Sequence, residues 1–170
     1  MCKRFVPLDF KAPQKSDLGE YYLEPITTDH TIEDWKVLQA NADIIVQLRG
    51  GSSRSEWPYK CTLEEDYKDL AWLEISASYN QLFCYILRKK RDKSYKGCIY
   101  IYPIDLFFPE KSEKYDVDFS WWLTRDEYEK GRYKMIFQKL LVWLYTNWPF
   151  KSERIYLRNK EIPEGINPIV

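Results

Sequence analysis

Residues 115–148 carry the clearest pattern of hydrophobic and polar positions in the chain. The first part alternates, with Val117, Phe119 and Trp121 on one side and Asp116, Asp118 and Ser120 on the other. A period of two is typical of a β-strand, and it predicts that Trp121 and Trp122 point to opposite faces. After a short charged loop, Gly131 begins an amphipathic helix that ends before Pro149. Its apolar residues recur at helical spacing: Ile136, Leu140, Trp143 and Leu144.

The remaining segments predict two more helices and four more strands. One helix is capped by Asp29 or Thr31 and runs to about residue 41. The second opens at a capping box formed by Thr62 and Glu65 and runs to about residue 79. Between them, residues 49–58 are rich in glycine and serine and predict a loop. β-rich runs predict the strands, at 21–26, 81–88, 97–104 and 154–157.

This order of elements predicts an α/β fold with a sheet of mixed direction. Three consecutive strands suit an antiparallel meander, and the crossover helix at 132–146 would place strand 154–157 parallel to the last of them and beside it. The length of 170 residues suits one domain. We expect an irregular arm at 1–20, a single domain at 21–160 and an irregular tail at 161–170.

Composition excludes several classes of function. Lys plus Arg equals Asp plus Glu at 26 each, so no global field would hold nucleic acid or an acidic membrane. No apolar run approaches the length of about 18 residues that a membrane span needs, and we expect a cytoplasmic protein. The four cysteines form no CxxC pair and the chain has one histidine, which argues against a zinc site and favours buried thiols. A cluster of cations at residues 89–96 fits a solvated hairpin turn better than a nucleic-acid site.

The junction of strand, glycine and helix at residue 131 predicts an anion-binding corner. Unpaired N–H groups and the helix dipole meet at a helix N-terminus, and both favour negative charge. Lys130, Arg132 and Lys134 add positive charge around Gly131. An alternative stays open, in which Gly131 only terminates the loop and the three cations form a solvated helix start.

The order of elements and the residues of this corner resemble the GNAT superfamily of N-acetyltransferases. In that family the motif [Q/R]-x-x-G-x-[G/A] enters the crossover helix, and here the aligned residues 128–133 read YEKGRY. Gly131 matches the central glycine, whereas Tyr128 and Tyr133 depart from the first and last positions. Gly97 opens the preceding strand, as a glycine commonly does there. With the segments WPYKCTLEEDYKDLAW, GCIYIYP and SWWLT, the resemblance covers residues 21–159 and points to a divergent branch with a degraded motif.

The resemblance implies that acetyl-CoA is the co-substrate. Main-chain amides of the motif hold the pyrophosphate of coenzyme A in the family, and the end of the preceding strand pairs with its pantetheine arm. The residues implied to contact the cofactor are Leu123, Thr124, Lys130, Gly131, Arg132, Tyr133 and Lys134. A tyrosine at position 133 either blocks the diphosphate or points away from it. Family members also carry a tyrosine acid farther on, whereas the eleven residues after Asn159 include no tyrosine.

Acetyl transfer to an amine needs a base and a donor to the developing oxyanion. Asp118 is the predicted catalytic residue, as that base, because it lies nearer than Asp116 to the strand end, and the N–H of Leu123 would serve the thioester carbonyl. The alternative is that both aspartates lie on a wet strand face. His30 precedes a helix and is explained by capping, without a catalytic partner.

Two functions of different classes follow. The leading hypothesis is an acetyl-CoA-dependent N-acetyltransferase acting on an unknown small amine or peptide amine. The rival is a catalytically inactive domain of the same fold that binds a ligand or a protein partner, as the departures at Tyr128 and Tyr133 suggest. Neither reading involves nucleic acid, a membrane or a metal, and a homodimer stays open as an assembly.

Overall fold

A computed structural model describes residues 4–52 and 56–166 of the chain. The helices in this part are α1 (Thr31–Leu48), α2 (Leu63–Ser78), α3 (Arg125–Glu129) and α4 (Tyr133–Asn147). The strands are β1 (Ser16–Asp17), β2 (Tyr21–Pro25), β3 (Phe83–Lys89), β4 (Tyr95–Pro103), β5 (Val117–Leu123) and β6 (Ile155–Leu157).

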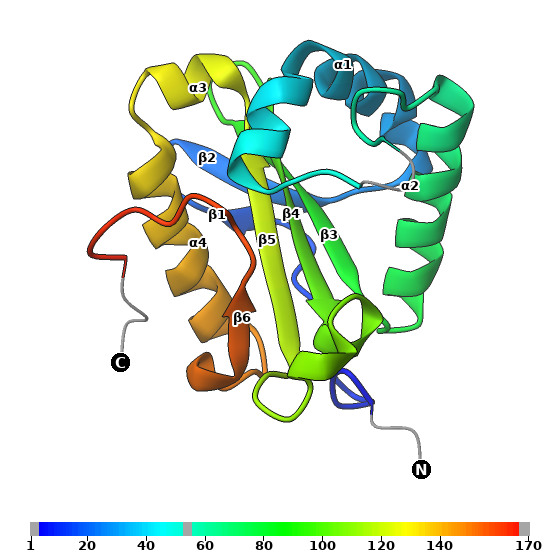
Figure 1. The fold of residues 1–170 in the computed structure, drawn as a ribbon, viewed down its shortest axis with the longest axis vertical. Coiled ribbons are helices and arrows are strands. Elements are labelled where there is room, and N and C mark those ends of the chain that lie inside the picture. Colours follow the sequence, from blue (N-terminus) through cyan, green and yellow to red (C-terminus); the bar gives the residue numbers. More distant parts are fainter. Residues whose placement is uncertain (1–3, 53–55, 167–170) are drawn as a thin grey trace.

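All six strands form one sheet in the order β1-β2-β3-β4-β5-β6 (Figure 1). Neighbours are antiparallel from β1 to β5, and β6 runs parallel to β5. The mixed sheet, the meander and the position of the last strand are therefore confirmed. Helix α4 makes the crossover between β5 and β6, as the sequence pattern predicts.

Helices cover the sheet on two sides (Figure 1). Trp121 faces α4, where its ring centroid lies 5.4 Å from that of Phe137. Trp122 faces α1 and α2, where it stacks on Tyr95 at 5.9 Å between ring centroids. Both indoles are fully buried, so the predicted split of the two tryptophans between the faces is confirmed.

The start of β4 shows how a bulge changes which side chains reach the face under α1. Leu87 pairs with Gly97 and Arg88 with Tyr95, so Lys96 is an extra residue without a partner in β3. Tyr95 therefore lies on the same face as Tyr100, and its hydroxyl donates to the carboxylate of Asp34 on α1.

Gly97 also brings β4 and β5 unusually close together. A Cβ atom at this position would lie 2.2 Å from the main-chain oxygen of Trp122, a separation that no side chain can tolerate. Gly97 lies directly opposite Leu123 in the ladder between these two strands. The glycine is therefore required where β4 passes the end of β5.

One predicted helix boundary is wrong, and the predicted irregular arm contains a strand. Helix α1 continues to Leu48, well beyond the predicted end near residue 41, because Ile44, Ile45 and Leu48 extend its buried stripe. The predicted arm contains β1, which pairs with β2.

The prediction of a charged loop before Gly131 is also wrong, because this segment contains helix α3. Asp126 and Glu127 occupy the first turn of α3, where the helix dipole favours acidic groups. Gly131 has φ +71 and links α3 to α4, and α4 itself starts at Tyr133. The capping box of Thr62 and Glu65 at α2 is confirmed. Within the described residues, we find no helix long and apolar enough to cross a membrane.

Candidate active site

The sheet opens between β5 and β6 after a short parallel ladder. β6 pairs only with Val117, Asp118 and Phe119, and one more main-chain bond joins the Arg158 N–H to the Phe119 oxygen. Trp121 is the next residue of β5 whose main-chain groups face this side, and it is bound by a side chain. The Asn159 amide accepts from the Trp121 N–H at 2.9 Å and donates to the Trp121 oxygen at 2.9 Å. Asn159 therefore extends the edge of β6 by one step with its side chain.

Leu123 lies one step beyond this contact on the same edge of β5. Alternate residues of an antiparallel strand direct their main-chain groups to the same side, so those of Leu123 face the same way as those of Trp121. Thr124 then turns back toward β4, where its N–H donates to the Lys96 oxygen at 2.8 Å. The main-chain groups of Leu123 are thus directed into the opening between the two strands.

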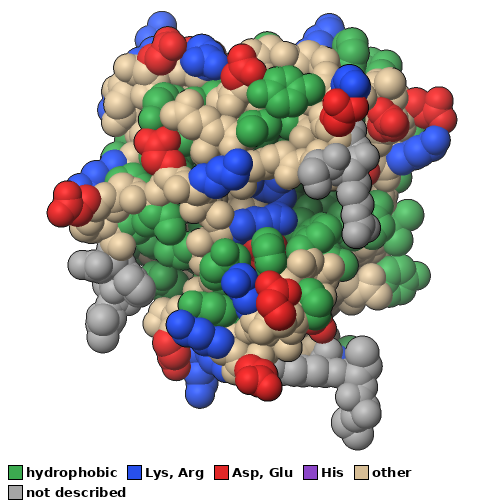
Figure 2. All heavy atoms as spheres, viewed as in Figure 1, with side chains coloured by type: hydrophobic (Ala, Val, Ile, Leu, Met, Phe, Trp, Pro, Cys, Tyr) green, Lys and Arg blue, Asp and Glu red, His purple; other side chains and the backbone are tan. Residues whose placement is uncertain are grey.

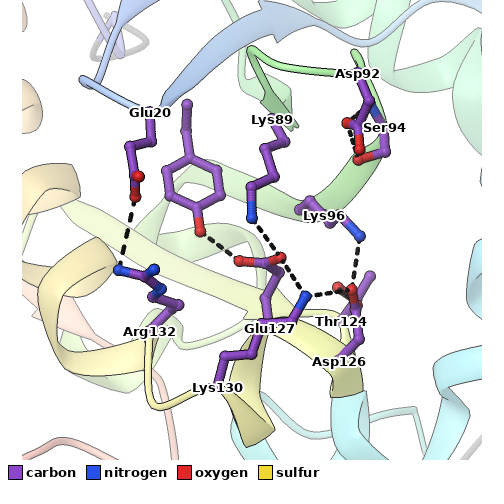
Figure 3. Close-up of polar contacts among 11 residues, drawn as sticks. Glu20, Lys89, Asp92, Ser94, Lys96, Thr124, Asp126, Glu127, Lys130 and Arg132 are labelled. Carbon is purple, nitrogen blue, oxygen red and sulfur yellow. Dashed lines mark hydrogen bonds and ion pairs between the residues drawn. The ribbon is translucent and has the colours of Figure 1, made fainter.

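The corner between β5 and α4 is occupied by α3 and its ion pairs (Figure 3). The Glu127 carboxylate is fully buried and accepts from the Tyr21 hydroxyl, from Lys89 at 3.0 Å and from Lys130 at 3.1 Å. Burial by itself would raise the pKa of Glu127, but these hydrogen bonds outweigh it and the pKa is lowered. Glu127 is therefore a buried anion that ties α3 to β2 and β3.

Two of the three cations predicted to hold a phosphate already have carboxylate partners. Lys130 pairs with Glu127 and, at 3.5 Å, with Asp126, and Arg132 pairs with Glu20 at 3.6 Å (Figure 3). Lys134 lies on the first turn of α4, with its ammonium near Gly165. A Cβ atom added at Gly131 would contact nothing within 4 Å, so the glycine faces open space. The structure thus brings Lys130, Gly131 and Arg132 together at the surface of one corner.

Tyr133 packs inward at the start of α4. Its ring stacks on Trp121 with 4.8 Å between centroids, and it is almost fully buried. Its hydroxyl donates to the Glu161 main-chain oxygen at 2.6 Å and lies 2.7 Å from the Asn159 amide nitrogen. The Tyr128 hydroxyl donates to the Glu161 carboxylate at 2.7 Å. The two tyrosines that depart from the family motif therefore both bind the segment after β6.

A separate cavity of about 260 Å³ lies between the sheet and helices α1 and α2. Figure 2 shows a hollow on this side of the molecule, in which Lys or Arg side chains lie between hydrophobic ones. Aromatic side chains form much of the cavity wall: Trp57, Trp72, Tyr100, Tyr102 and Phe107. Its polar lining includes Arg49 and, near the start of α2, Asp34, Asp66 and Asp69.

Asp118 lies on the face that carries this cavity, but it does not line it. Its side chain is 0% exposed, and both carboxylate oxygens lack a hydrogen bond within the described residues. The nearest charge is Arg158, whose guanidinium lies 3.6 Å from the carboxylate. Burial raises the pKa of Asp118, while Arg158 and Arg49 act in the opposite direction. The alternative of a wet strand face is therefore wrong for Asp118, whereas Asp116 is half-buried and pairs with Arg154.

Arg49 and Arg158 are the functional candidates that sequence reasoning missed. The Arg49 Nε donates to the Ser120 hydroxyl at 2.9 Å, and its guanidinium lies 4.0 Å from the centre of the Tyr100 ring. Arg158 lies 5.2 Å from the ring centres of Phe107 and of Phe108. Burial lowers the pKa of Arg158, and repulsion by Arg49 lowers it further. The two residues are far apart in the chain, and β6, which runs beside β5, brings Arg158 near enough for the charge of Arg49 to act on it.

Asp34 and Asp66 form an acidic pair at the other end of the cavity. Asp66 is 1% exposed, and its Oδ2 atom has no hydrogen-bond partner within residues 4–52 and 56–166. Burial raises the pKa of both carboxyls, and the negative charge of Asp34 raises that of Asp66 further. This arrangement favours a proton held between the two groups. In the part of the chain that the structure describes, no group of His, Cys, Asp and Glu side chains could hold a metal ion.

Comparison with known proteins identifies the fold. No family model matches the chain, and no curated protein matches its sequence. The ribosomal-protein-S5-alanine acetyltransferase from Vibrio fischeri is 14% identical with a TM-score of 0.57, over 78% of this chain and 68% of that one. RimL, a ribosomal L7/L12 alpha-N-protein acetyltransferase in complex with coenzyme A, is 15% identical with a TM-score of 0.57, over 77% and 67%. Mycobacterium smegmatis RimJ in complex with CoA-disulfide is 10% identical with a TM-score of 0.56, over 79% and 60%.

Proposed function

We propose that this chain, whose fold is that of the GNAT N-acetyltransferases, binds acetyl-CoA where β5 meets α4 and transfers the acetyl group to an amine. The observation that carries the proposal is the opening between β5 and β6, with the main chain of Leu123 directed into it beside the N-terminus of a 15-residue helix. RimL and RimJ, which share this fold, bind coenzyme A or its disulfide. The proposed contacts to the cofactor are Leu123, Thr124, Lys130, Gly131, Arg132, Tyr133 and Lys134.

The proposed reaction joins the amine nitrogen to the thioester carbonyl carbon and breaks the carbon–sulfur bond. The N–H of Leu123 would donate to the oxyanion, and a base would take the proton that the amine loses. The thiolate that leaves takes up a proton to give free coenzyme A. The acceptor is a small amine or a peptide amine, and the cavity under α1 and α2 is its proposed site. A cytoplasmic location is part of the same proposal.

Asp118 is the proposed base, although its position also suits a second role. A base must contact the amine directly or through one water, and Asp118 lies behind the cavity wall beside Arg158. As a base it would require Arg158 to move aside, whereas as a positioning residue it would hold Arg158 in place. Asp118→Asn separates the roles. If Asp118 is the base, Asp118→Asn removes the decrease of the acetyl-transfer rate toward acidic pH. If Asp118 only positions Arg158, the variant keeps the shape of the pH profile.

Calorimetry with acetyl-CoA tests the cofactor site. We expect binding in the micromolar range for the natural chain and at least about tenfold weaker binding for Gly131→Trp, whose indole would fill the open space at the corner. Gly131→Ala is the matched control, because it shares the strain at φ +71 without the bulk. Absence of heat with the natural chain, or equal losses in both variants, would refute the proposed site. Turnover is followed as free thiol released on a panel of amines.

A second candidate function is a ligand-binding domain without chemistry, and one observation favours it. Asn159 already occupies both main-chain groups of Trp121, which leaves fewer positions on β5 for a pantetheine arm. Binding of acetyl-CoA without turnover on any amine would favour this reading. If Asn159→Ala tightened the binding of acetyl-CoA, the side chain and the cofactor would be shown to compete for β5.

A further inference from the structure

Arg49 presents a rigid guanidinium to the cavity under α1 and α2. Its Nε is bound to Ser120, and the planar group lies between Tyr100 at 4.0 Å and Trp57 at 5.4 Å from the ring centres. Among residues 4–52 and 56–166 no carboxylate lies within ion-pair distance of it. The terminal nitrogens of an arginine fixed in this way form a fork that matches a planar anion.

The charges around this fork do not balance. Arg158 lies near enough for its positive charge to act on Arg49, and both act on Asp118, the acid 3.6 Å from Arg158. With Asp118 ionised, two positive charges face one negative charge, and one positive charge is left over. An excess charge in a half-buried site is costly for the free protein, and the cost falls when a monoanion binds.

The walls of the cavity describe the rest of the ligand. Trp57, Trp72 and Phe107 line it together with Tyr100 and Tyr102, so the body of a ligand would meet aromatic faces. A volume of about 260 Å³ suits a small molecule.

The acidic groups of the cavity lie away from Arg49. Tyr95, which binds Asp34, precedes Tyr100, which stacks on Arg49, by five residues of β4. Because Lys96 is the extra residue of the bulge, the two tyrosines are four ladder positions apart, which corresponds to about 13 Å along a strand. A carboxylate would therefore bind at the Arg49 end, with its apolar part between the rings.

We propose that this cavity binds a small organic carboxylate with an apolar or aromatic body, through the guanidinium of Arg49. A monoanion matches the single excess charge, and a dianionic phosphate does not. The inference rests on the proposed function in one respect: an amine acetylated here would carry a carboxylate. Binding itself is measured without acetyl-CoA, so the two proposals can fail separately.

The first experiment compares three probes on the natural chain by calorimetry and by ¹H–¹⁵N chemical shifts. We expect 3-phenylpropanoate to bind and to shift the amide signals around Arg49, and its neutral amide to bind at least about tenfold more weakly. Equal binding of acid and amide would overturn the proposal. So would the absence of binding at about 10 mM, or a preference for inorganic phosphate over the carboxylate.

The second experiment removes the fork. Arg49→Gln should weaken binding of 3-phenylpropanoate at least about tenfold, while Arg91→Gln, a change at an exposed turn, should leave it unchanged. Circular dichroism confirms that each variant is folded. If Arg49→Gln is folded and binds as the natural chain does, the assignment of Arg49 is wrong. If Arg49→Gln does not fold, the comparison of 3-phenylpropanoate with its neutral amide on the natural chain decides whether the cavity binds a carboxylate.

Discussion

The side chain of Asn159 binds the main chain of Trp121 as a neighbouring β-strand would. Its oxygen accepts from the Trp121 N–H and its nitrogen donates to the Trp121 oxygen, both at 2.9 Å. One amide therefore satisfies two main-chain groups that the end of β6 would otherwise leave unpaired in the protein interior. The same nitrogen contacts the Tyr133 hydroxyl, so the contact also fixes the start of α4.

Asn159→Ala should lower the free energy of unfolding by about 2–3 kcal/mol, because it leaves buried main-chain groups without partners. The measurement is urea unfolding followed by tryptophan fluorescence. Asn147→Ala is the control, since Asn147 is exposed and water replaces its hydrogen bonds. A loss no larger than that of the control would mean that the segment after Leu157 contributes little to β5.

Glu127→Gln should also destabilise the fold, by about 2 kcal/mol, because the buried carboxylate accepts from Tyr21, Lys89 and Lys130. Glutamine keeps the shape but leaves the Lys89 ammonium without its anion and Lys130 with Asp126 alone. Glu129→Gln on the same helix is exposed and should change stability by less than about 0.5 kcal/mol. Similar unfolding midpoints for the two variants would show that the ion pairs around α3 are not stabilising.

Asp66→Asn should flatten the dependence of stability on pH. The folded state holds the proton on Asp66 more tightly than the unfolded chain does, because burial and Asp34 raise its pKa above the ordinary 3.8. Asp66 therefore contributes its full stabilisation of the folded state below pH 3.8. This contribution is lost as the pH rises toward the raised pKa of Asp66.

We expect the natural chain to lose at least about 1 kcal/mol more than Asp66→Asn between about pH 5 and pH 8. Thermal unfolding of both proteins at the two pH values measures this difference in stability. Asp105→Asn, at an exposed position, should keep the natural slope. If Asp66→Asn kept the natural slope of stability against pH, groups other than Asp66 would cause the pH dependence.

The thiols of Cys84 and Cys98 should resist alkylation in the folded protein. Their sulfur atoms lie 3.2 Å apart between β3 and β4, both are buried, and burial raises the pKa of Cys84 far above its ordinary value. Pulsed iodoacetamide labelling with peptide mapping should find both unmodified until urea unfolds the chain. Cys61 should also react slowly, because burial raises its pKa to about 12. Rapid native labelling of Cys84 or Cys98 would reveal local opening of the sheet.

Periodic patterns in the sequence predict most of the fold. The alternation around Phe119 and the helical spacing around Leu140 reflect burial on one face, which a single chain segment displays by itself. The pattern does not predict helix α3, because its charged residues are typical of a loop, although Asp126 and Glu127 suit a first helical turn.

The candidate site could be predicted only in part. Gly131 and its neighbouring cations could be found because they are adjacent in sequence. Arg49, Asn159 and Arg158 stand at the ends of elements, and their partners come from other strands, so no local pattern marks them. The alternation predicts Asp118, but it does not predict the ion pair with Arg158, which the topology of β6 brings beside it.

The two outer strands are the shortest of the sheet, and this limits how copies of the chain could associate. β1 has two residues and β6 has three, so neither border offers a long row of unpaired N–H and C=O groups. A further strand added at either side would gain few hydrogen bonds. Aggregation by sheet extension is therefore disfavoured, and a specific dimer would have to form through side chains on the helical surfaces.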